Sequence, residues 1–316
     1  MKKKLSPKVV IVIVNWNGGK KIVDCLSSLK MTLYPNFEVI LVDNCSKDNS
    51  IKQLKRIIPS MKIIKLKKNY GYTIATNLGW QYGIKKLKAD YICAMDSDIV
   101  TVERSWLTKV INELEKSEKR GIACCKLIFP DNRLQRLYFE RKVTEYQEID
   151  NGAYDFIKEV EGVGGACIVI KKEVIEKIGH YDENFFYGPN DFDYCFRARR
   201  AGFICVYVGT TKAIHVGSSS YIASDRTNIF KPQAEGNIIY QIRHFGWSAG
   251  VSMVLLQVAR IFITKKEPYK KRTLSNLYFH KDIIKRGLYF LSALRYALKN
   301  YAQIKKGDLY ASTIKK

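Results

Sequence analysis

Short apolar runs alternate with amphipathic segments along the first hundred residues. The runs occupy positions 9–14, 37–42, 61–66 and 91–95 and predict strands. The first, Val9 to Val14, is a continuous β-branched run, which is typical of a strand buried on both faces in a parallel sheet. Between them, apolar residues recur at helical spacing, and the last of these three segments predicts a helix over about 73–86. This alternation predicts a doubly wound α/β sheet.

The next hundred residues continue the alternation less regularly. Residues 130–159 are charged and weakly periodic, so they predict only an insertion. Before this insertion, the sequence predicts a helix over 105–116 and a strand over 122–129. After it come a strand over 163–170 entered through Gly164 and Gly165, a helix over 173–178, a further helix and a strand over 204–208. The further helix begins at Asn190 or Asp191 and has Phe192, Cys195 and Phe196 on its apolar side.

Polar residues follow each of the first four strands. The four groups are Asn15-Trp16-Asn17, Asp43-Asn44, Asn69-Tyr70-Gly71 and Asp96-Ser97-Asp98. Each group alone would suit an ordinary turn or helix cap. In doubly wound sheets, however, ligands bind outside the carboxyl ends of the strands. Four polar groups at one edge therefore predict a ligand site.

Asp96 and Asp98 carry the clearest chemistry of these groups. Side chains two residues apart on an extended chain point the same way, so the two carboxylates would repel each other without a cation between them. Mg²⁺ and Mn²⁺ prefer oxygen ligands and are often held by one or two carboxylates together with substrate phosphates. The pair predicts a metal–diphosphate site, with a solvated turn as the alternative.

A second set of candidate residues lies between positions 164 and 217. Asp191 precedes a predicted helix and could act as a general base or only cap that helix. His215 stands just before a Gly-Ser run and could complete the metal site, or be an ordinary surface residue. Gly164 and Gly165 would let the backbone approach a ligand closely.

Composition describes a folded protein with an uneven charge. The 316 residues are 47% hydrophobic and 27% charged, and the net charge is +24. From Arg260 to Lys316 there are 15 Lys and Arg against three acids, which gives 15 − 3 = +12 in the tail. An anionic partner, either lipid headgroups or nucleic acid, or a merely basic surface would explain this. No zinc-finger spacing or RNA-binding aromatic motif is present, so nucleic acid is not expected.

The tail also has apolar features. Residues 245–259 are uncharged but fall short of the roughly 20 apolar residues of a spanning helix. Farther on, one predicted helical face holds Leu288, Leu291, Leu294, Leu298 and Tyr301, with Arg295 and Lys299 elsewhere. Such a helix could lie in a membrane interface or pack on the catalytic domain. The eight cysteines form no CxxC pair and no signal-peptide cleavage site follows Lys2-Lys3-Lys4, so we expect a cytoplasmic protein, which this tail could hold at the inner face of the cell membrane.

Seven short motifs follow one another along the chain: Val14-Asn15-Trp16-Asn17-Gly18, Leu41-Val42-Asp43-Asn44, Asn69-Tyr70-Gly71, Asp96-Ser97-Asp98, Gly164-Gly165, Asn190-Asp191-x-Asp193-x-x-x-Arg197 and His215-x-Gly217. In this order, the motifs resemble those of inverting family 2 glycosyltransferases of the GT-A fold, especially rhamnosyltransferase-like members. The chain departs from the family at two places: the family often has Glu-Asp where this chain has Asn190-Asp191, and its Gly-Gly pair appears here as Ile74-Ala75.

The resemblance implies a fold and a reaction. It implies a Rossmann-like mixed sheet flanked by helices over 1–225, with a nucleotide-binding half over about 1–100 and an acceptor half over 101–225. A basic helical extension over 226–316 would follow. The implied enzyme is a metal-dependent hexosyltransferase that moves rhamnose or another sugar from a dTDP- or UDP-linked donor to a glycan or lipid-linked glycan in cell-surface polysaccharide synthesis.

The resemblance also implies residue roles. Asp191 would be the catalytic base that activates the acceptor hydroxyl. Asp98 and His215 would bind Mg²⁺ or Mn²⁺. The donor-binding residues would be Asn15, Asp43, Asn69, Gly71 and Asp96, and the acceptor-side residues would be Asn190, Asp193 and Gly165.

Other classes of protein stay open from the sequence. Asp96-Ser97-Asp98-Ile99-Val100 fits the pattern of haloacid dehalogenase-type phosphoryl transfer, although that pair normally follows the first strand of the core. A non-catalytic basic binding protein, or a degenerate transferase suggested by Asn190, is also open. A dehydrogenase is disfavoured because no G-x-G-x-x-G follows the first strand.

Overall fold

The computed structural model of the chain divides into two compact units. The first is Met1–Tyr181 with Asn190–Ser220, and the second is Asp182–Pro189 with Tyr221–Lys316. The structure describes residues 6–48, 50–135, 138–139, 148–186, 188–217, 227–263 and 283–302.

The first half of unit 1 is a parallel sheet with the strand order β3-β2-β1-β4. The apolar runs seen in the sequence form these strands, so the predicted alternation is confirmed. The strands are β1 (Val9–Asn15), β2 (Phe37–Asp43), β3 (Lys62–Lys65) and β4 (Tyr91–Asp96). The helices between them are α1 (Gly19–Leu29), α2 (Ser50–Ile57) and α3 (Tyr72–Lys85).

The second half of unit 1 makes the sheet mixed. Strand β10 (Cys167–Lys171) runs antiparallel to both β4 and β6 (Arg120–Ile128). Strand β11 (Ile204–His215) is parallel to β6 and antiparallel to β5 (Ile99–Thr101) and β8 (Ile157–Val160). A separate pair joins β7 (Tyr138–Phe139) to β9 (Gly162–Val163). The helices of this half are α4 (Trp106–Glu115), α5 (Lys172–Ile178) and α6 (Asn190–Arg200).

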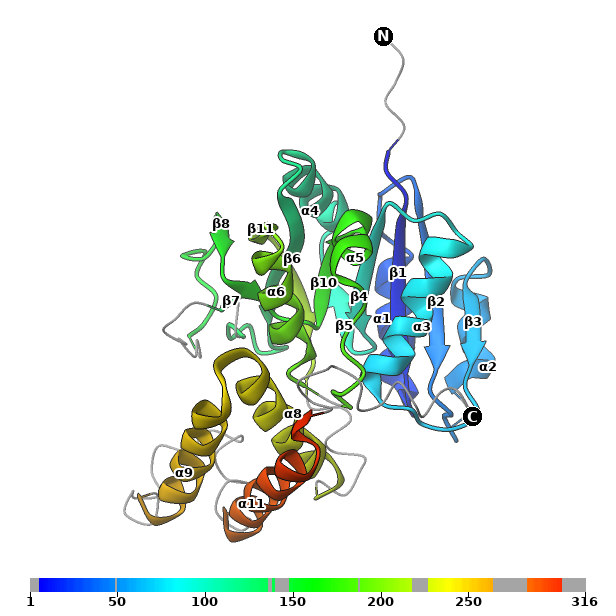
Figure 1. Cartoon of the computed structure of the whole chain (residues 1–316). Coiled ribbons are helices and arrows are strands. Elements are labelled where there is room, and N and C mark those ends of the chain that lie inside the picture. The colour runs from blue at the N-terminus through cyan, green and yellow to red at the C-terminus, as the bar shows by residue number, and fades with distance from the viewer. Residues whose placement is uncertain are drawn as a thin grey trace. The chain divides into compact units, whose positions relative to one another are not determined.

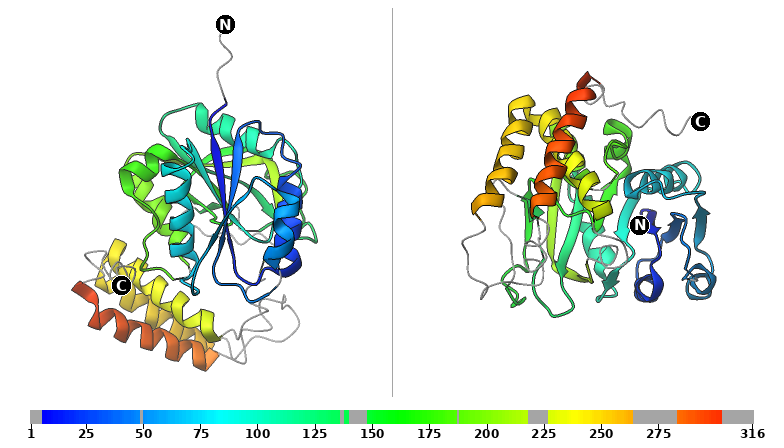
Figure 2. Two further views of the ribbon diagram at one scale, coloured as in Figure 1. Left: turned by 90° about the vertical axis from the view of Figure 1, so that its right-hand side faces the viewer. Right: turned by 90° about the horizontal axis from the view of Figure 1, so that it is seen from below.

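Helices cover both faces of this sheet because the strands are apolar on both. Side chains alternate along a strand, so Val9, Ile11 and Ile13 pack in one cluster with α1 and α4. Val10 and Val12 belong to the opposite cluster with α3, α5 and α6. Figure 1 shows α3, α5 and α6 on the near face, and the left view of Figure 2 shows the sheet between its two helical layers.

Several predicted boundaries were wrong. The single strand expected over 163–170 is two strands, because the chain turns at 164–166 and β9 pairs with β7 outside the main sheet. Strand β11 continues past Val208 through a register shift to His215. Helix α6 buries Tyr194, Cys195 and Ala198, whereas the expected Phe192 and Phe196 are only half-buried. Strands β5 and β8 escaped prediction because their partners on β11 are distant in sequence.

Unit 2 is built from α8 (Thr227–Phe245), α9 (Trp247–Ile263) and α11 (Ile283–Lys299), which lie side by side in the right view of Figure 2. Phe185 packs in their core with side chains of α8 and with Ala293 and Ala297 of α11. Over the described residues, no helix is long and apolar enough to cross a membrane.

The apolar face expected on the last helix is not its packing face. Small residues allow close helix packing, and α11 accordingly buries Ala293 and Ala297. Leu294 is partly buried against them, while Leu291 and Leu298 are 49% and 56% exposed. The side chain of Leu288 and the basic residues of 264–282 and 303–316 lie outside the described residues.

Candidate active site

The polar groups that follow the strands meet at one edge of the sheet, as predicted. In the parallel register Asn15 lies opposite Asp43, and Val14 lies opposite Asp96. The antiparallel strand β10 begins at the same edge, because the Asp96 N–H donates to the Ala166 carbonyl at 2.8 Å. The carboxyl ends of the parallel strands and the Gly164-Gly165 turn therefore border one site.

The structure brings Asp96, Asp98 and His215 together. The His215 Nε2 atom lies 3.4 Å from Asp98 Oδ1 and 3.8 Å from Asp96 Oδ2. Strand β5 explains this meeting, since it starts directly after Asp98 and pairs Ile99 with His215. The Val216 N–H closes the junction by donating to the Asp98 carbonyl at 3.2 Å. The pairing of β5 with β11, more than a hundred residues later in the chain, therefore brings the three side chains together.

The trio has an excess of negative charge. Burial raises the pKa of Asp96 to about 7, and the charges of Asp98 and Asp191 add to this although His215 and the Tyr72 hydroxyl oppose it. Burial alone would lower the pKa of His215, but the two neighbouring carboxylates outweigh it and raise that pKa. One donor atom from each of the three residues lies within 4.8 Å of the others. Two carboxylates and one imidazole nitrogen suit Mg²⁺ or Mn²⁺.

Asn15 and Asp43 form a buried pair beside this trio. Asn15 Nδ2 donates to Asp43 Oδ1 at 3.3 Å and to the Ser46 hydroxyl at 3.0 Å. The same Asp43 oxygen accepts the Ser46 N–H at 3.3 Å. Ser46, which lies in the loop after β2 and bonds to both Asn15 and Asp43, was not identified from the sequence. The orientation of the Asp43 carboxylate is therefore fixed from two sides.

Asn44 organises the next turn along the edge. Its Oδ1 accepts the Tyr70 N–H at 2.9 Å, and its Nδ2 donates to Asn69 Oδ1 at 2.8 Å and to the Gly71 carbonyl at 3.1 Å. Asn69 is exposed, yet its Oδ1 also accepts the Gly71 N–H at 2.8 Å. Gly71 has a φ of 84°, which a glycine adopts without strain. In this structure Asn69 and Gly71 shape the turn that precedes α3.

Asp191 lies in the first turn of α6 and faces Gly165. Its Oδ2 accepts the Gly165 N–H at 3.0 Å, and its Oδ1 accepts the Phe192 N–H at 2.9 Å. A Cβ atom on Gly165 would lie 2.9 Å from the Asp191 Cβ. The close approach expected at this glycine is therefore an approach by Asp191. The Asp191 charge also contributes to the raised pKa of Asp96, so the two carboxylates share one electrostatic environment.

Two residues expected on the acceptor side are buried. Asn190 is 7% exposed and Asp193 is 0% exposed. Asp193 accepts from Arg197 Nε at 2.7 Å across one helical turn, and Arg197 also donates to the carbonyls of Ile178 and His180. The Asp193 carboxylate thus points into the protein, in place of the expected acceptor-side position, and its partner Arg197 ties α6 to the end of α5 and the residues that follow it.

Comparison with known proteins decides the family. Glycosyl transferase family 2 matches residues 10–179 of the 316-residue chain. The chain belongs to this family. The match covers all but the first residue of the parallel half of the sheet, together with Asp96, Asp98 and Gly165. It gives no support to a phosphoryl-transfer enzyme or a basic binding protein.

Two curated relatives are named for the biosynthesis of O-antigen and of amylovoran. The O-antigen biosynthesis protein RfbC of Myxococcus xanthus is 25% identical over 230 residues, which cover 68% of this chain and 18% of RfbC. The amylovoran biosynthesis glycosyltransferase AmsB of Erwinia amylovora is 28% identical over 209 residues, covering 63% of this chain and 66% of AmsB. The chain spans between 18% and 59% of the length of the first three curated relatives.

Solved structures of glycosyltransferases share the fold. The mannosyltransferase PcManGT from Pyrobaculum calidifontis, solved with GDP-Man and Mn²⁺, matches with a TM-score of 0.58 at 14% identity and covers 94% of this chain and 88% of that one. TarS 1-349 of S. aureus, solved with UDP-GlcNAc, matches with a TM-score of 0.52 at 12% identity over 94% and 92% of the two chains. The expected GT-A fold, with its mixed sheet between helices, is confirmed.

Proposed function

We propose that this family 2 chain is a metal-dependent, inverting glycosyltransferase. Its donor would be a hexose or deoxyhexose such as rhamnose on UDP or dTDP, and its acceptor a hydroxyl of a glycan or lipid-linked glycan. The observation that carries the proposal is that Asp191 lies at the same sheet edge as Asp96, Asp98 and His215. A base for the acceptor and a cation site for the departing diphosphate are the two parts such a reaction needs.

The donor half of the proposal rests on residues of β1, β2 and β4. Asp43 and Asn15 would bind the nucleotide base, since the Asp43 carboxylate can accept a hydrogen bond from the ring N–H of uracil or thymine. Asp98 and His215 would hold Mg²⁺ or Mn²⁺, with Asp96 completing the shell or binding the ribose. The bound cation would stabilise the negative charge of the diphosphate leaving group. The complex of PcManGT with GDP-Man and Mn²⁺ supports a cation and a nucleotide sugar on this fold.

The acceptor half rests on Asp191. As the acceptor oxygen bonds to the anomeric carbon, Asp191 would take the hydroxyl proton, and the nucleoside diphosphate would leave from the opposite face with the bonding electron pair. This single displacement inverts the anomeric configuration. The N–H groups of Gly165 and Phe192 hold the two Asp191 oxygens, so the carboxylate is oriented before the acceptor binds. Asn190 removes the second carboxylate that the family often has, and leaves Asp191 as the base.

A transfer assay tests the base. Asp191→Asn should lower kcat by about 10²- to 10⁴-fold, because the amide cannot accept the proton, while nucleotide binding persists. Asp24→Asn, on the exposed side of α1, is the matched control and should keep full activity. The anomeric configuration of the product, read by NMR, reports inversion. A retained configuration, or an Asp191→Asn enzyme that turns over normally, contradicts the proposal.

Unit 2 would hold the enzyme at the cytoplasmic leaflet. Leu255, Leu256, Leu291 and Leu298 are 63%, 64%, 49% and 56% exposed on α9 and α11, and the tail is strongly basic. Eight free cysteines are consistent with a reducing compartment. We expect the full chain to sediment with vesicles that contain anionic lipid, and a Leu291→Glu, Leu298→Glu variant to do so more weakly. Leu33→Glu, at a leucine 59% exposed in unit 1, is the control, and equal sedimentation of all three proteins contradicts the assignment.

A further inference from the structure

Gln135 makes two hydrogen bonds to a single residue, His215. Its Nε2 donates to the His215 carbonyl oxygen at 2.6 Å, and its Oε1 lies 2.8 Å from His215 Nδ1. Gln135 is only 9% exposed. A buried amide that meets both the backbone and the ring of one residue fixes the direction of that ring.

The two ends of a glutamine amide, its oxygen and its NH₂ group, can be told apart here from the group that each one faces. A carbonyl oxygen can only accept, so the Gln135 NH₂ group must face the His215 carbonyl. The Gln135 Oε1 atom then faces His215 Nδ1, and because Oε1 can also only accept, Nδ1 must carry a proton. The proton on Nδ1 leaves Nε2, the nitrogen directed at Asp96 and Asp98, as the ring atom that can bind a cation.

We propose that Gln135 is a positioning residue that holds His215 in the Nδ1–H tautomer with Nε2 aimed at the cation site. The inference rests on the cation site of the proposed function and adds to it a residue that touches neither substrate nor cation. Partners that accept the second N–H of a ligating histidine orient the ring and raise its basicity. Gln135 has this geometry toward His215.

The segment that carries Gln135 is itself fixed to the sheet. The Gln135 N–H donates to the Leu127 carbonyl at 3.0 Å, and the Phe129 N–H donates to the Arg133 carbonyl at 2.8 Å. The chain therefore leaves β6, turns, and returns beside it. This return places Gln135 next to the end of β11, which is parallel to β6 and carries His215.

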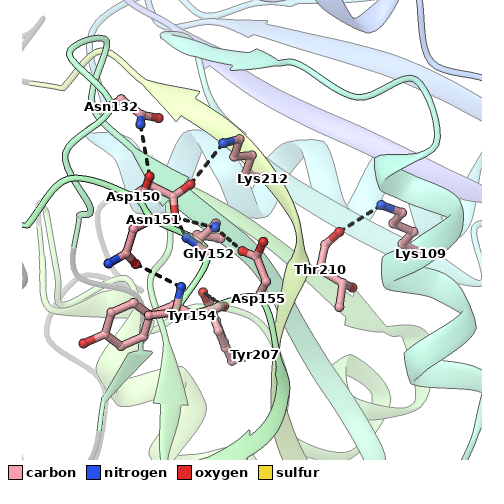
Figure 3. A network of polar contacts seen from close by, with 12 residues as sticks. Lys109, Asn132, Asp150, Asn151, Gly152, Tyr154, Asp155, Tyr207, Thr210 and Lys212 are labelled. Atoms are coloured by element: carbon pink, nitrogen blue, oxygen red, sulfur yellow. Dashed lines mark hydrogen bonds and ion pairs between the residues drawn. The ribbon is translucent and has the colours of Figure 1, made fainter.

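Ion pairs around the buried side chains of Lys126 and Asp150 anchor the neighbouring residues 148–155. Lys126 Nζ lies 2.7 Å from Asp150 Oδ1, and Lys212 Nζ lies 3.0 Å from Asp150 Oδ2, while Asp155 also pairs with Lys126. Figure 3 shows Asp150 between Lys212 and Asn132, whose side-chain amide donates to the Asp150 carbonyl at 3.3 Å. The Asp150 N–H in turn donates to the Asn132 carbonyl at 2.8 Å. Lys126 and Lys212 stand opposite each other on β6 and β11, so the network joins both strands to the turn that precedes Gln135.

Two measurements on the full chain test the role of Gln135. The first is Mn²⁺ affinity, obtained from the loss of the free Mn²⁺ EPR signal on titration. Gln135→Met keeps the length of the side chain and removes both hydrogen bonds, and it should weaken Mn²⁺ binding by about 10- to 100-fold. Arg133→Ala, on the same turn but paired with Asp131, is the control and should bind Mn²⁺ as the wild type does.

The second measurement is the ¹⁵N–¹H spectrum of histidine-labelled protein without metal. The wild type should show a slowly exchanging Nδ1–H resonance of His215, assigned with His215→Gln, and Gln135→Met should lose it. This readout on the wild type stands even if the variant folds poorly. Wild-type Mn²⁺ binding that Gln135→Met leaves unchanged, or a wild-type His215 protonated on Nε2 alone, overturns the inference and leaves the proposed function intact. Absence of Mn²⁺ binding by the wild type overturns both.

Discussion

Replacing Gly165 by alanine should disable the proposed base without touching it chemically. The new Cβ would lie 2.9 Å from Asp191 Cβ and 3.3 Å from both Asp191 Cγ and Oδ2. Carbon atoms in contact prefer about 3.5–4.0 Å, so Asp191 must withdraw by roughly 3.5 − 2.9 = 0.6 Å or more. Gly165 does not have a positive φ, so the backbone itself accommodates alanine without strain. The perturbation is therefore a displacement of the Asp191 carboxylate.

A displacement of this size has a large expected effect on turnover. A shift of about 1 Å in a reacting group can cost about 10²-fold in rate, so Gly165→Ala should lower kcat by about 10- to 100-fold. Overpacking should also cost about 1–3 kcal/mol of stability, measured by urea unfolding. Nucleotide binding with Mn²⁺ should be unchanged, because none of Asn15, Asp43 and Asp98 moves.

Gly83→Ala is a matched control for the Gly165 substitution. A Cβ on Gly83 would also approach a neighbour to 2.9 Å, but that neighbour is Ile92 Cδ1 in the core. This control should change stability and keep kcat. A folded Gly165→Ala enzyme with wild-type kcat would falsify the view that Gly165 makes room for a catalytic Asp191.

Two further predictions concern the supports of the site. Asn44→Ala should lower the free energy of unfolding by about 1–3 kcal/mol, because the buried Gly71 carbonyl and the half-buried Tyr70 N–H lose their hydrogen bonds; an unchanged urea midpoint would show that the turn holds without the Asn44 side chain. Lys126→Met should cost about 3 kcal/mol at neutral pH. Burial alone would raise the pKa of Asp150, but the hydrogen bonds from Lys126 and Lys212 outweigh it and lower that pKa from its usual value. A carboxylate whose pKa is lower in the folded than in the unfolded state stabilises the protein at higher pH, and this stabilisation is lost as the pH falls. The wild type should therefore lose more stability than Lys126→Met below about pH 4, and equal losses in the two proteins would contradict this.

The sequence predicted the parts of the site that depend on local pattern. Continuous apolar runs end at Asn15, Asp43 and Asp96, and parallel pairing brings such ends to one edge whatever the loops do. Asp98 and Asp191 could be identified for the same reason, since each follows directly from a recognisable strand or helix start. These predictions needed only the apolar pattern that marks each strand or helix and the polar residues that stand where the element ends or begins.

The parts that the sequence did not predict depend on distant pairing. Gln135 lies in a stretch without periodicity, and its partner His215 is 80 residues away. Asp193 could face either side of α6, and only its bond to Arg197 and the carbonyls beyond shows that it faces inward. Gly165 predicted that another group approaches the backbone closely, but the sequence could not show whether that group is a ligand or Asp191.

Calorimetric binding of UDP, dTDP and GDP to the purified full chain, with and without Mn²⁺, tests the central claim most directly. The account predicts that UDP or dTDP binds, that binding requires Mn²⁺, and that Asp98→Ala abolishes it while Asp24→Ala does not. Preference between the three nucleotides would also show whether Asp43 selects a pyrimidine. A folded protein that binds none of them, or binds equally well without Mn²⁺ and with Asp98→Ala, would contradict the assignment of Asp96, Asp98 and His215 as the cation site of a nucleotide-sugar transferase.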